Sequence, residues 1–113
     1  MNAKLTNLVK NKLSNETISM HSCVTIYQEI FNTLVEVFEK SNIQISNEAM
    51  NFVAQTYYSS IKINNQHPLD PNIFTQKAKM ENINTKELAF IAIVFNHTEY
   101  CADIVKEIKR RSL

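Results

Sequence analysis

The chain has 113 residues, of which 44% are hydrophobic and 20% are charged, and its formal net charge is +1. This size and balance are those of a single folded domain spanning residues 1–113, and they argue against disorder. A net charge so close to zero creates no overall field that would draw the protein onto nucleic acid or an anionic membrane.

Glycine is absent from the sequence, and proline occurs twice, at Pro68 and Pro71. Tight hairpin turns need backbone angles that glycine adopts most easily, so a sheet protein with many such turns is disfavoured. Helices need glycine mainly at their C-terminal caps, where asparagine can replace it. The composition therefore predicts an all-α protein. Its abundant asparagine, isoleucine and lysine have A/T-rich codons, which suggests an AT-rich microbial, phage or plasmid gene.

No targeting or membrane segment is predicted. Residues 1–15 alternate apolar and polar side chains and lack the apolar stretch of a signal peptide. The longest apolar run, residues 88–95, is far shorter than the roughly 20 residues that a membrane span needs. The two cysteines do not make a disulfide framework. These features predict a cytoplasmic protein.

Hydrophobic periodicity predicts the first two helices. Residues 5–13 place their apolar side chains on one helical face, and residues 19–40 form a longer helix with a wide apolar stripe. That stripe comprises Cys23, Tyr27, Ile30, Leu34, Val37 and Phe38, and it is widened by Val24, Phe31 and Val35. Its width indicates that the second helix meets neighbours on two sides.

A third helix is predicted to begin after Ser46, whose hydroxyl can cap it, with Glu48 in the first turn where the helix dipole favours an anion. Its apolar face comprises Met50, Val53, Tyr57 and Ile61. Residues 63–72 form the clearest loop, and Asp70-Pro71 at its end is a strong helix start. The short helix expected there carries Ile73, Phe74, Lys77 and Met80.

The last helix is predicted to begin after a cap at Asn84 or Thr85, with Glu87 placed for a capping box. One face of it carries Leu88, Ile91, Phe95, Ala102 and Val105. Residues 88–95 are apolar all round, which predicts a central helix covered on every side. Residues 96–98 either kink this helix or split it in two. The predicted fold is an all-α, single-domain irregular or orthogonal bundle of five to six helices.

Both cysteines and two of the three histidines lie in two short stretches, MHSCV and FNHTEYCADI. His97 and Cys101 share a helical face, so both could ligate one zinc ion. His21 and Cys23 would complete the site only from a non-helical turn, because positions two apart diverge on a helix. Cys23 also lies on the apolar stripe of its own helix, as a buried thiol would. We expect core packing and no cofactor, with a metal site at these four residues as the alternative.

An enzyme is not expected. Phosphate-binding loops, dinucleotide-binding fingerprints and nucleophile elbows all depend on glycine, which the chain lacks. Cys101 beside His97 supplies two members of a nucleophilic group, but Glu99 lies on a different side of the helix. A thiol buried among apolar side chains is also inert, because burial raises its pKa.

Protein binding is the preferred interpretation. Adjacent Tyr57 and Tyr58, with Phe52 off the main stripe of the third helix, indicate either an exposed apolar patch typical of interface cores or a multi-helix core that uses both faces of this helix. The loop that holds His67 and Leu69 is stiff, exposed and suited to contact. The chain is therefore interpreted as a small binding module, with a homo-oligomer as one form. A narrower hypothesis is a phage- or plasmid-encoded modulator or inhibitor of a host enzyme, such as a defence or CRISPR effector.

The alternative function is that of a nucleic-acid-binding accessory protein. Lys106, Lys109, Arg110 and Arg111 lie in the basic end KEIKRRSL and could contact phosphates. The same cations also complement the dipole at a helix C-terminus. A recognition helix begins with polar side chains that read bases, whereas the last helix begins with apolar residues, which counts against a helix-turn-helix.

Overall fold

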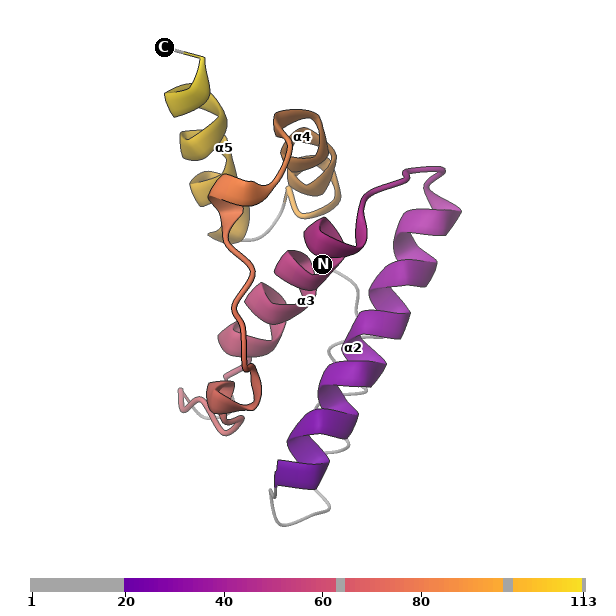
Figure 1. Cartoon of the computed structure of the whole chain (residues 1–113), viewed down its shortest axis with the longest axis vertical. Coiled ribbons are helices and arrows are strands. Elements are labelled where there is room, and N and C mark those ends of the chain that lie inside the picture. Colours follow the sequence, from indigo (N-terminus) through magenta and orange to yellow (C-terminus); the bar gives the residue numbers. More distant parts are fainter. Residues whose placement is uncertain (1–19, 63–64, 97–98, 113) are drawn as a thin grey trace.

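The computed structural model describes residues 20–62, 65–96 and 99–112. Within these ranges the chain forms four α-helices and two 3-10 turns, and no β-strand (Figure 1). In order they are α2 (Met20–Lys40), α3 (Asn47–Ser60), η1 (Pro71–Ile73), η2 (Met80–Asn82), α4 (Thr85–Val94) and α5 (Glu99–Arg111). The predicted all-α class is confirmed, whereas the expected count of five to six helices is not. The helix predicted at residues 5–13 lies outside the described residues.

Helix α3 has the central position in this arrangement. It runs back alongside α2, and the pair formed by α4 and α5 packs at its other side (Figure 1). Buried side chains from all four α-helices form one hydrophobic cluster. Its fully buried larger members are Cys23, Ile26, Ile30, Leu34, Phe38, Tyr58, Leu88, Ile91 and Ile104. None of the helices in the described ranges combines the length and apolar character that a membrane span requires.

Asparagine closes the end of α2 in place of glycine. Asn42 has φ 57°, the left-handed conformation that ends many helices. Its N–H donates to the carbonyl of Glu39 at 3.0 Å, and the N–H of Ile43 donates to the carbonyl of Phe38 at 3.0 Å. These two hydrogen bonds make a Schellman motif, in which Ile43 packs against the core. The direction of the chain after α2 is therefore fixed by backbone hydrogen bonds.

The short helix predicted after Asp70 does not form as an α-helix. Asp70 caps the turn as expected, because its Oδ1 accepts from the N–H of Asn72 at 2.9 Å. The turn nevertheless ends at Ile73, and Phe74 is already extended, with φ −85° and ψ 116°. Phe74 packs edge-on against Tyr27 and Tyr58, with ring centroids 5.0 and 5.3 Å away. Tertiary packing of this ring outweighs the local helix signal.

The amide of Gln55 holds the extended chain that follows. Its Oε1 accepts from the N–H of Ala78 at 2.9 Å, and its Nε2 donates to the carbonyl of Gln76 at 3.4 Å. One side chain of α3 thus replaces part of the hydrogen bonding that a helix would have given residues 74–79. The chain reaches α4 as an extended segment beside α3 (Figure 1).

Of the two alternatives for the last helical region, a kink or a split, the structure has the split, because α4 ends at Val94 and α5 begins at Glu99. The prediction that residues 88–95 are covered on every side is wrong. Leu88, Ile91 and Phe95 are buried, but Ala89 is exposed and Ile93 is 64% exposed. Among the residues that the structure describes, one face of α4 is therefore left exposed.

Candidate protein-binding site

The apolar patch predicted on α3 is not on the surface. Phe52 and Tyr58 are buried, and so is Leu69, whereas Tyr57 is half-buried and His67 is exposed. Phe52 lies off the predicted stripe, and it lines a small space together with Val53 of that stripe, Ile91 of α4 and Ile104 of α5. The prediction failed because α3 is packed on two sides, so both of its apolar faces belong to the core.

Tyr58 illustrates this burial. Its hydroxyl donates to the carbonyl of Asp70 at 3.0 Å, and its ring packs edge-on against Tyr27 with centroids 6.0 Å apart. Burial, followed by the neighbouring Cys23 thiol, raises the pKa of Tyr58 far above its ordinary value. The residue therefore remains a neutral donor that anchors the loop to the core.

The structure does not assemble the alternative metal site from the residues that it describes. Cys23 is buried on α2 while His21 is exposed, as their two-residue spacing on a helix requires. The Sγ of Cys101 lies 3.7 Å from the carbonyl oxygen of Ala92, to which it donates. His97 lies outside the described ranges, and inside them no three His, Cys, Asp or Glu residues gather as a metal site would need.

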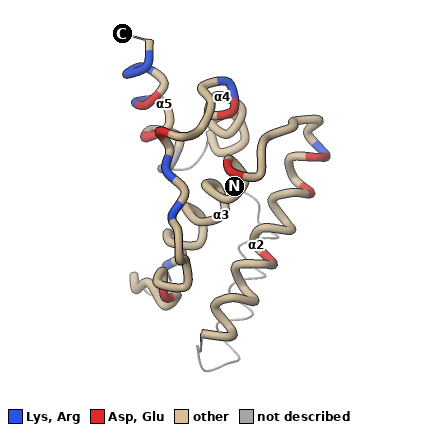
Figure 2. The backbone as a smooth tube through the Cα atoms, viewed as in Figure 1, with Lys and Arg blue, Asp and Glu red and all other residues tan. Residues whose placement is uncertain are grey.

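The basic end of α5 is partly engaged within the protein. Arg110 donates through Nε to Glu107 Oε2 at 2.8 Å and through Nη2 to Oε1 at 2.5 Å. The guanidinium of Arg110, with a smaller part from Arg111, lowers the pKa of the Glu107 carboxyl to about 2. Lys106 and Lys109 are exposed, and basic residues gather at this end of the molecule (Figure 2). Arg110 and Arg111 thus both pair with the carboxylate of Glu107. Lys106 and Lys109 are therefore the better candidates for the phosphate contacts of the nucleic-acid-binding alternative.

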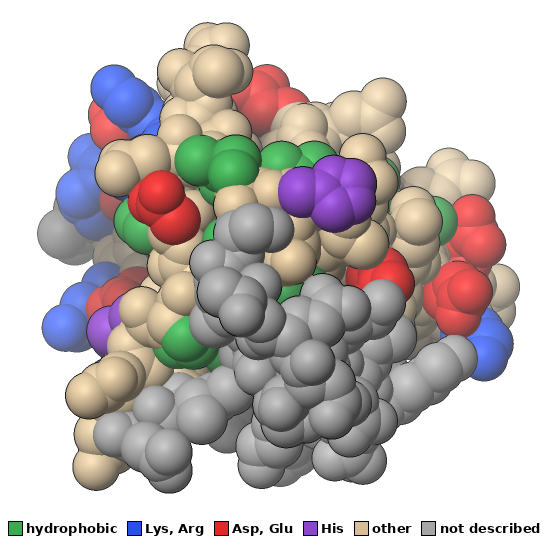
Figure 3. Space-filling model, turned by 90° about the horizontal axis from the view of Figure 1, so that it is seen from below, with side chains coloured by type: hydrophobic (Ala, Val, Ile, Leu, Met, Phe, Trp, Pro, Cys, Tyr) green, Lys and Arg blue, Asp and Glu red, His purple; other side chains and the backbone are tan. Residues whose placement is uncertain are grey.

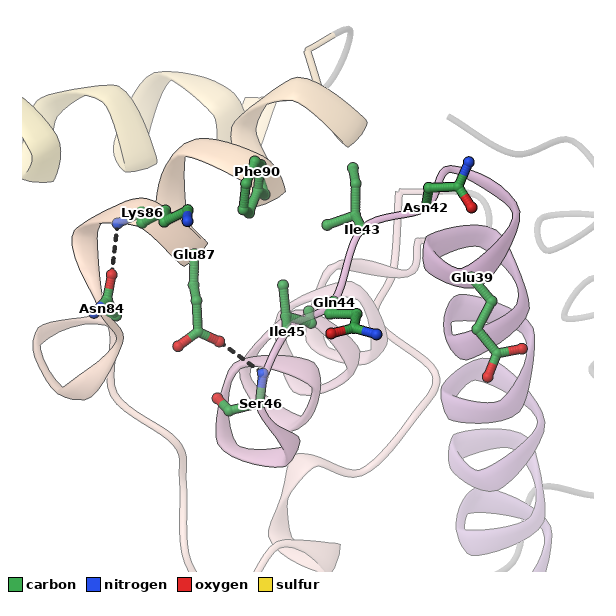
Figure 4. Close-up of a pocket in the computed structure, with 10 residues that line it drawn as sticks. All are labelled: Glu39, Asn42, Ile43, Gln44, Ile45, Ser46, Asn84, Lys86, Glu87 and Phe90. Atoms are coloured by element: carbon green, nitrogen blue, oxygen red, sulfur yellow. Dashed lines mark hydrogen bonds between the residues drawn. The ribbon is translucent and has the colours of Figure 1, made fainter.

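A groove of about 730 Å³ lies between the α2–α3 connection and the first turns of α4 (Figure 4). Ile43 and Ile45 of the connection and Phe90 of α4 supply its half-buried apolar surface. Its other lining residues are polar or charged: Glu39, Asn42, Gln44, Ser46, Asn84, Lys86 and Glu87. The groove therefore offers apolar contact surface with hydrogen-bonding groups around it, as protein-binding sites do.

One hydrogen bond between distant parts of the chain joins the two walls of this groove. Ser46 caps α3, and its Oγ accepts from the N–H of Ala49 at 3.1 Å. The N–H of Ser46 itself donates to Oε2 of Glu87 on α4 at 2.7 Å (Figure 4). In a capping box this acceptor would be the side chain of the third residue of α3, but that residue is Ala49, whose side chain has no acceptor atom. Glu87 of another helix supplies it.

This arrangement corrects the predicted role of Glu87. The cap of α4 is Asn84, whose Oδ1 accepts from the N–H of Lys86 at 2.7 Å. Glu87 serves α3 rather than closing a box on its own helix. The site thus gains a defined shape from one tertiary hydrogen bond together with the Schellman motif at Asn42.

The charges at the groove differ between its walls. Glu39 is exposed at the α2 wall, whereas Lys86 is exposed at the α4 wall, with its Nζ 5.9 Å from the centre of the Phe90 ring. Acidic residues lie along the end of α2 that borders the groove (Figure 2). Seen from below, the described residues show hydrophobic atoms in separate areas between polar side chains (Figure 3).

No family model matches the chain, and no curated protein or solved structure was found to be significantly similar to it.

The groove was not predicted from the sequence, because Ile43 and Ile45 lie in the connection between the second and third predicted helices. The sequence feature that could have indicated the groove is the pair of apolar residues, Ile43 and Ile45, that directly follow a helix end closed by Asn42.

Proposed function

We propose that this protein is a small, non-enzymatic binding module and that the groove between the α2–α3 connection and α4 receives a segment of a partner protein. The observation that supports it most is the accessible apolar surface of Phe90, Ile43 and Ile45 inside a groove of about 730 Å³. Its walls are ordered by backbone and capping hydrogen bonds, so a partner meets a preformed surface and loses less entropy on binding.

The charges suggest the chemistry of the partner segment. An apolar side chain entering between Phe90 and Ile43 is flanked by Glu39 on one side and Lys86 on the other. We therefore propose a segment with an apolar anchor and a basic residue that reaches Glu39. Electrostatic complementarity of this kind sets orientation more than affinity. The narrower proposal, a mobile-element modulator of a host enzyme, draws on the amino-acid composition, which is rich in residues with A/T-rich codons, and not on the groove.

The test is a selection of peptides from a random display library on the immobilised wild-type protein. We expect selected peptides to share an apolar residue near a Lys or Arg. Phe90→Ser should weaken their binding at least about tenfold, as for an interface anchor. Val24→Ser is the matched control, because Val24 is an exposed apolar residue on α2 outside the groove. Peptides that bind Phe90→Ser as well as wild type would contradict the proposed site.

The nucleic-acid alternative has a separate readout. Phosphate contacts give binding that falls steeply with salt concentration. Lys106→Ala combined with Lys109→Ala removes the two lysines of the basic end that are exposed, without touching Arg111. If duplex DNA binds at moderate salt and this double variant abolishes binding, the alternative replaces the proposed function.

A further inference from the structure

The exposed apolar surface of α4 extends beyond the groove, whose lining includes Lys86 and Phe90 but not Ala89 or Ile93. Ile93 is 64% exposed, more than any other large hydrophobic residue of the described chain. Ala89 is exposed one turn before it, and Lys86 one turn before that, while Phe90 is half-buried at the edge. Residues three and four apart lie on one side of a helix, so these four form one continuous stripe.

This stripe is complementary to itself when read in opposite directions. In an antiparallel pair with its two-fold axis between Ala89 and Phe90, small Ala89 meets large Phe90 of the other copy. Lys86 then meets Ile93, where its aliphatic stem can cover the exposed side chain. Two-fold pairing of identical surfaces is also the commonest form of self-association.

The single charge in the stripe distinguishes the two directions of pairing. In the antiparallel arrangement, the ammonium of Lys86 lies beside the C-terminal turn of the partner α4, where the helix dipole favours a cation. In a parallel arrangement, the two Lys86 ammonium groups repel each other, and Phe90 meets Phe90. Glu87, the other charged residue of α4, is directed to Ser46 of its own chain.

From this self-complementarity we infer that a second copy of the chain covers the open face of α4, in an antiparallel α4–α4 contact. The ten residues of α4 span only about 15 Å. Stable dimers bury roughly 1,200 Å² or more, which a contact between two such short helices does not reach alone. The dimer is accordingly weak and forms at high protein concentration. This inference does not depend on the proposed partner of the groove.

The experiment is sedimentation equilibrium of the full chain from about 10 µM to about 1 mM, the range in which small interfaces assemble. We expect the mass of wild type to rise from 13.1 kDa towards twice that value. Ile93→Lys should remain at the mass of one chain throughout. Val24→Lys, the same change at a residue that is 40% exposed on α2, should associate as wild type does.

Lys86→Glu tests the direction of pairing, since it places an anion beside the partner helix end. Two such contacts per dimer should weaken association by about fivefold to twentyfold. Circular dichroism establishes that each variant is folded, which the exposure of both sites leads us to expect. A wild type that stays at 13.1 kDa at the highest concentration overturns the inference. So does an Ile93→Lys variant that associates normally, or a Lys86→Glu variant that associates more strongly.

Discussion

Arg111 is the residue whose loss should damage the fold most among the charged side chains of α5. Its Nη1 donates to the carbonyl of Ile83 at 2.5 Å and to Oγ1 of Thr85 at 3.0 Å, and its Nη2 donates to the carbonyl of Met80 at 2.9 Å. Its Nε also donates to Oε1 of Glu107 at 3.2 Å. One guanidinium thus joins the end of α5 to η2 and to the start of α4.

The magnitude follows from these contacts. Hydrogen bonds to a charged donor contribute roughly 1.5–3 kcal/mol each when buried, and less where water can replace the donor. The Arg111 side chain is 18% exposed, so we take about 1 kcal/mol for each of the two carbonyl contacts. Arg111→Ala should therefore lower the free energy of unfolding by about 2–3 kcal/mol. For a chain of this size that corresponds to a decrease in Tm of roughly 10 °C or more.

Arg110 provides a matched control on the neighbouring position. Its side chain is 66% exposed, and its hydrogen bonds within the described residues go to Glu107. Exposed ion pairs of this kind contribute little, so Arg110→Ala should cost less than about 0.5 kcal/mol. Urea unfolding followed by circular dichroism compares the two variants. Equal destabilisation by both, or a loss below about 0.5 kcal/mol for Arg111→Ala, would refute the role assigned to Arg111.

Three further predictions concern the contacts that shape the molecule. Glu87→Ala removes the acceptor for the N–H of Ser46 and should cost about 1 kcal/mol in urea unfolding, with Glu87→Gln losing less, because an amide still accepts; equal losses would contradict the role of this hydrogen bond. Tyr58→Phe deletes the donor to the Asp70 carbonyl and should cost about 1 kcal/mol, so an unchanged urea midpoint would argue against that anchor. The pKa of Glu107 is lowered from 4.5 to about 2, so its contribution to stability is complete above pH 4.5 and is lost as the pH falls towards 2. Glu107→Gln should remove that part of the pH dependence of Tm between these values, and a variant with the full wild-type dependence would contradict it.

Local chemistry was sufficient to predict several parts of the fold. The second helix was expected at residues 19–40 and is found at Met20–Lys40, because its apolar period is long and regular. Ser46 and Asn84 cap helices as predicted, and Asn42 adopts the left-handed angle expected of a glycine substitute. Each of these features depends on contacts within one turn of the chain, which the sequence displays directly.

The errors all involve contacts between residues far apart in the sequence. Phe74 leaves its predicted helix for a ring contact with Tyr27, and Glu87 accepts from the N–H of Ser46, which lies 41 residues earlier and caps α3. Periodicity left open whether Phe52 is exposed in a patch or buried on a second core face of α3, and the structure has it buried. Periodicity shows which residues share a face, but it does not show how many faces a helix buries. The groove, which forms between two separated segments, was invisible for the same reason.

The central claim is that a partner segment binds in the groove beside α4. Its most direct test is an NMR titration of the ¹⁵N-labelled protein with the tightest peptide from the display selection, with Phe90→Ser as control. We predict that the largest amide shift changes fall on Ile43, Ile45 and Phe90, and that the variant shows little change at the same peptide concentration. Shift changes centred on Lys106 and Lys109, or on the loop at His67, would contradict the account.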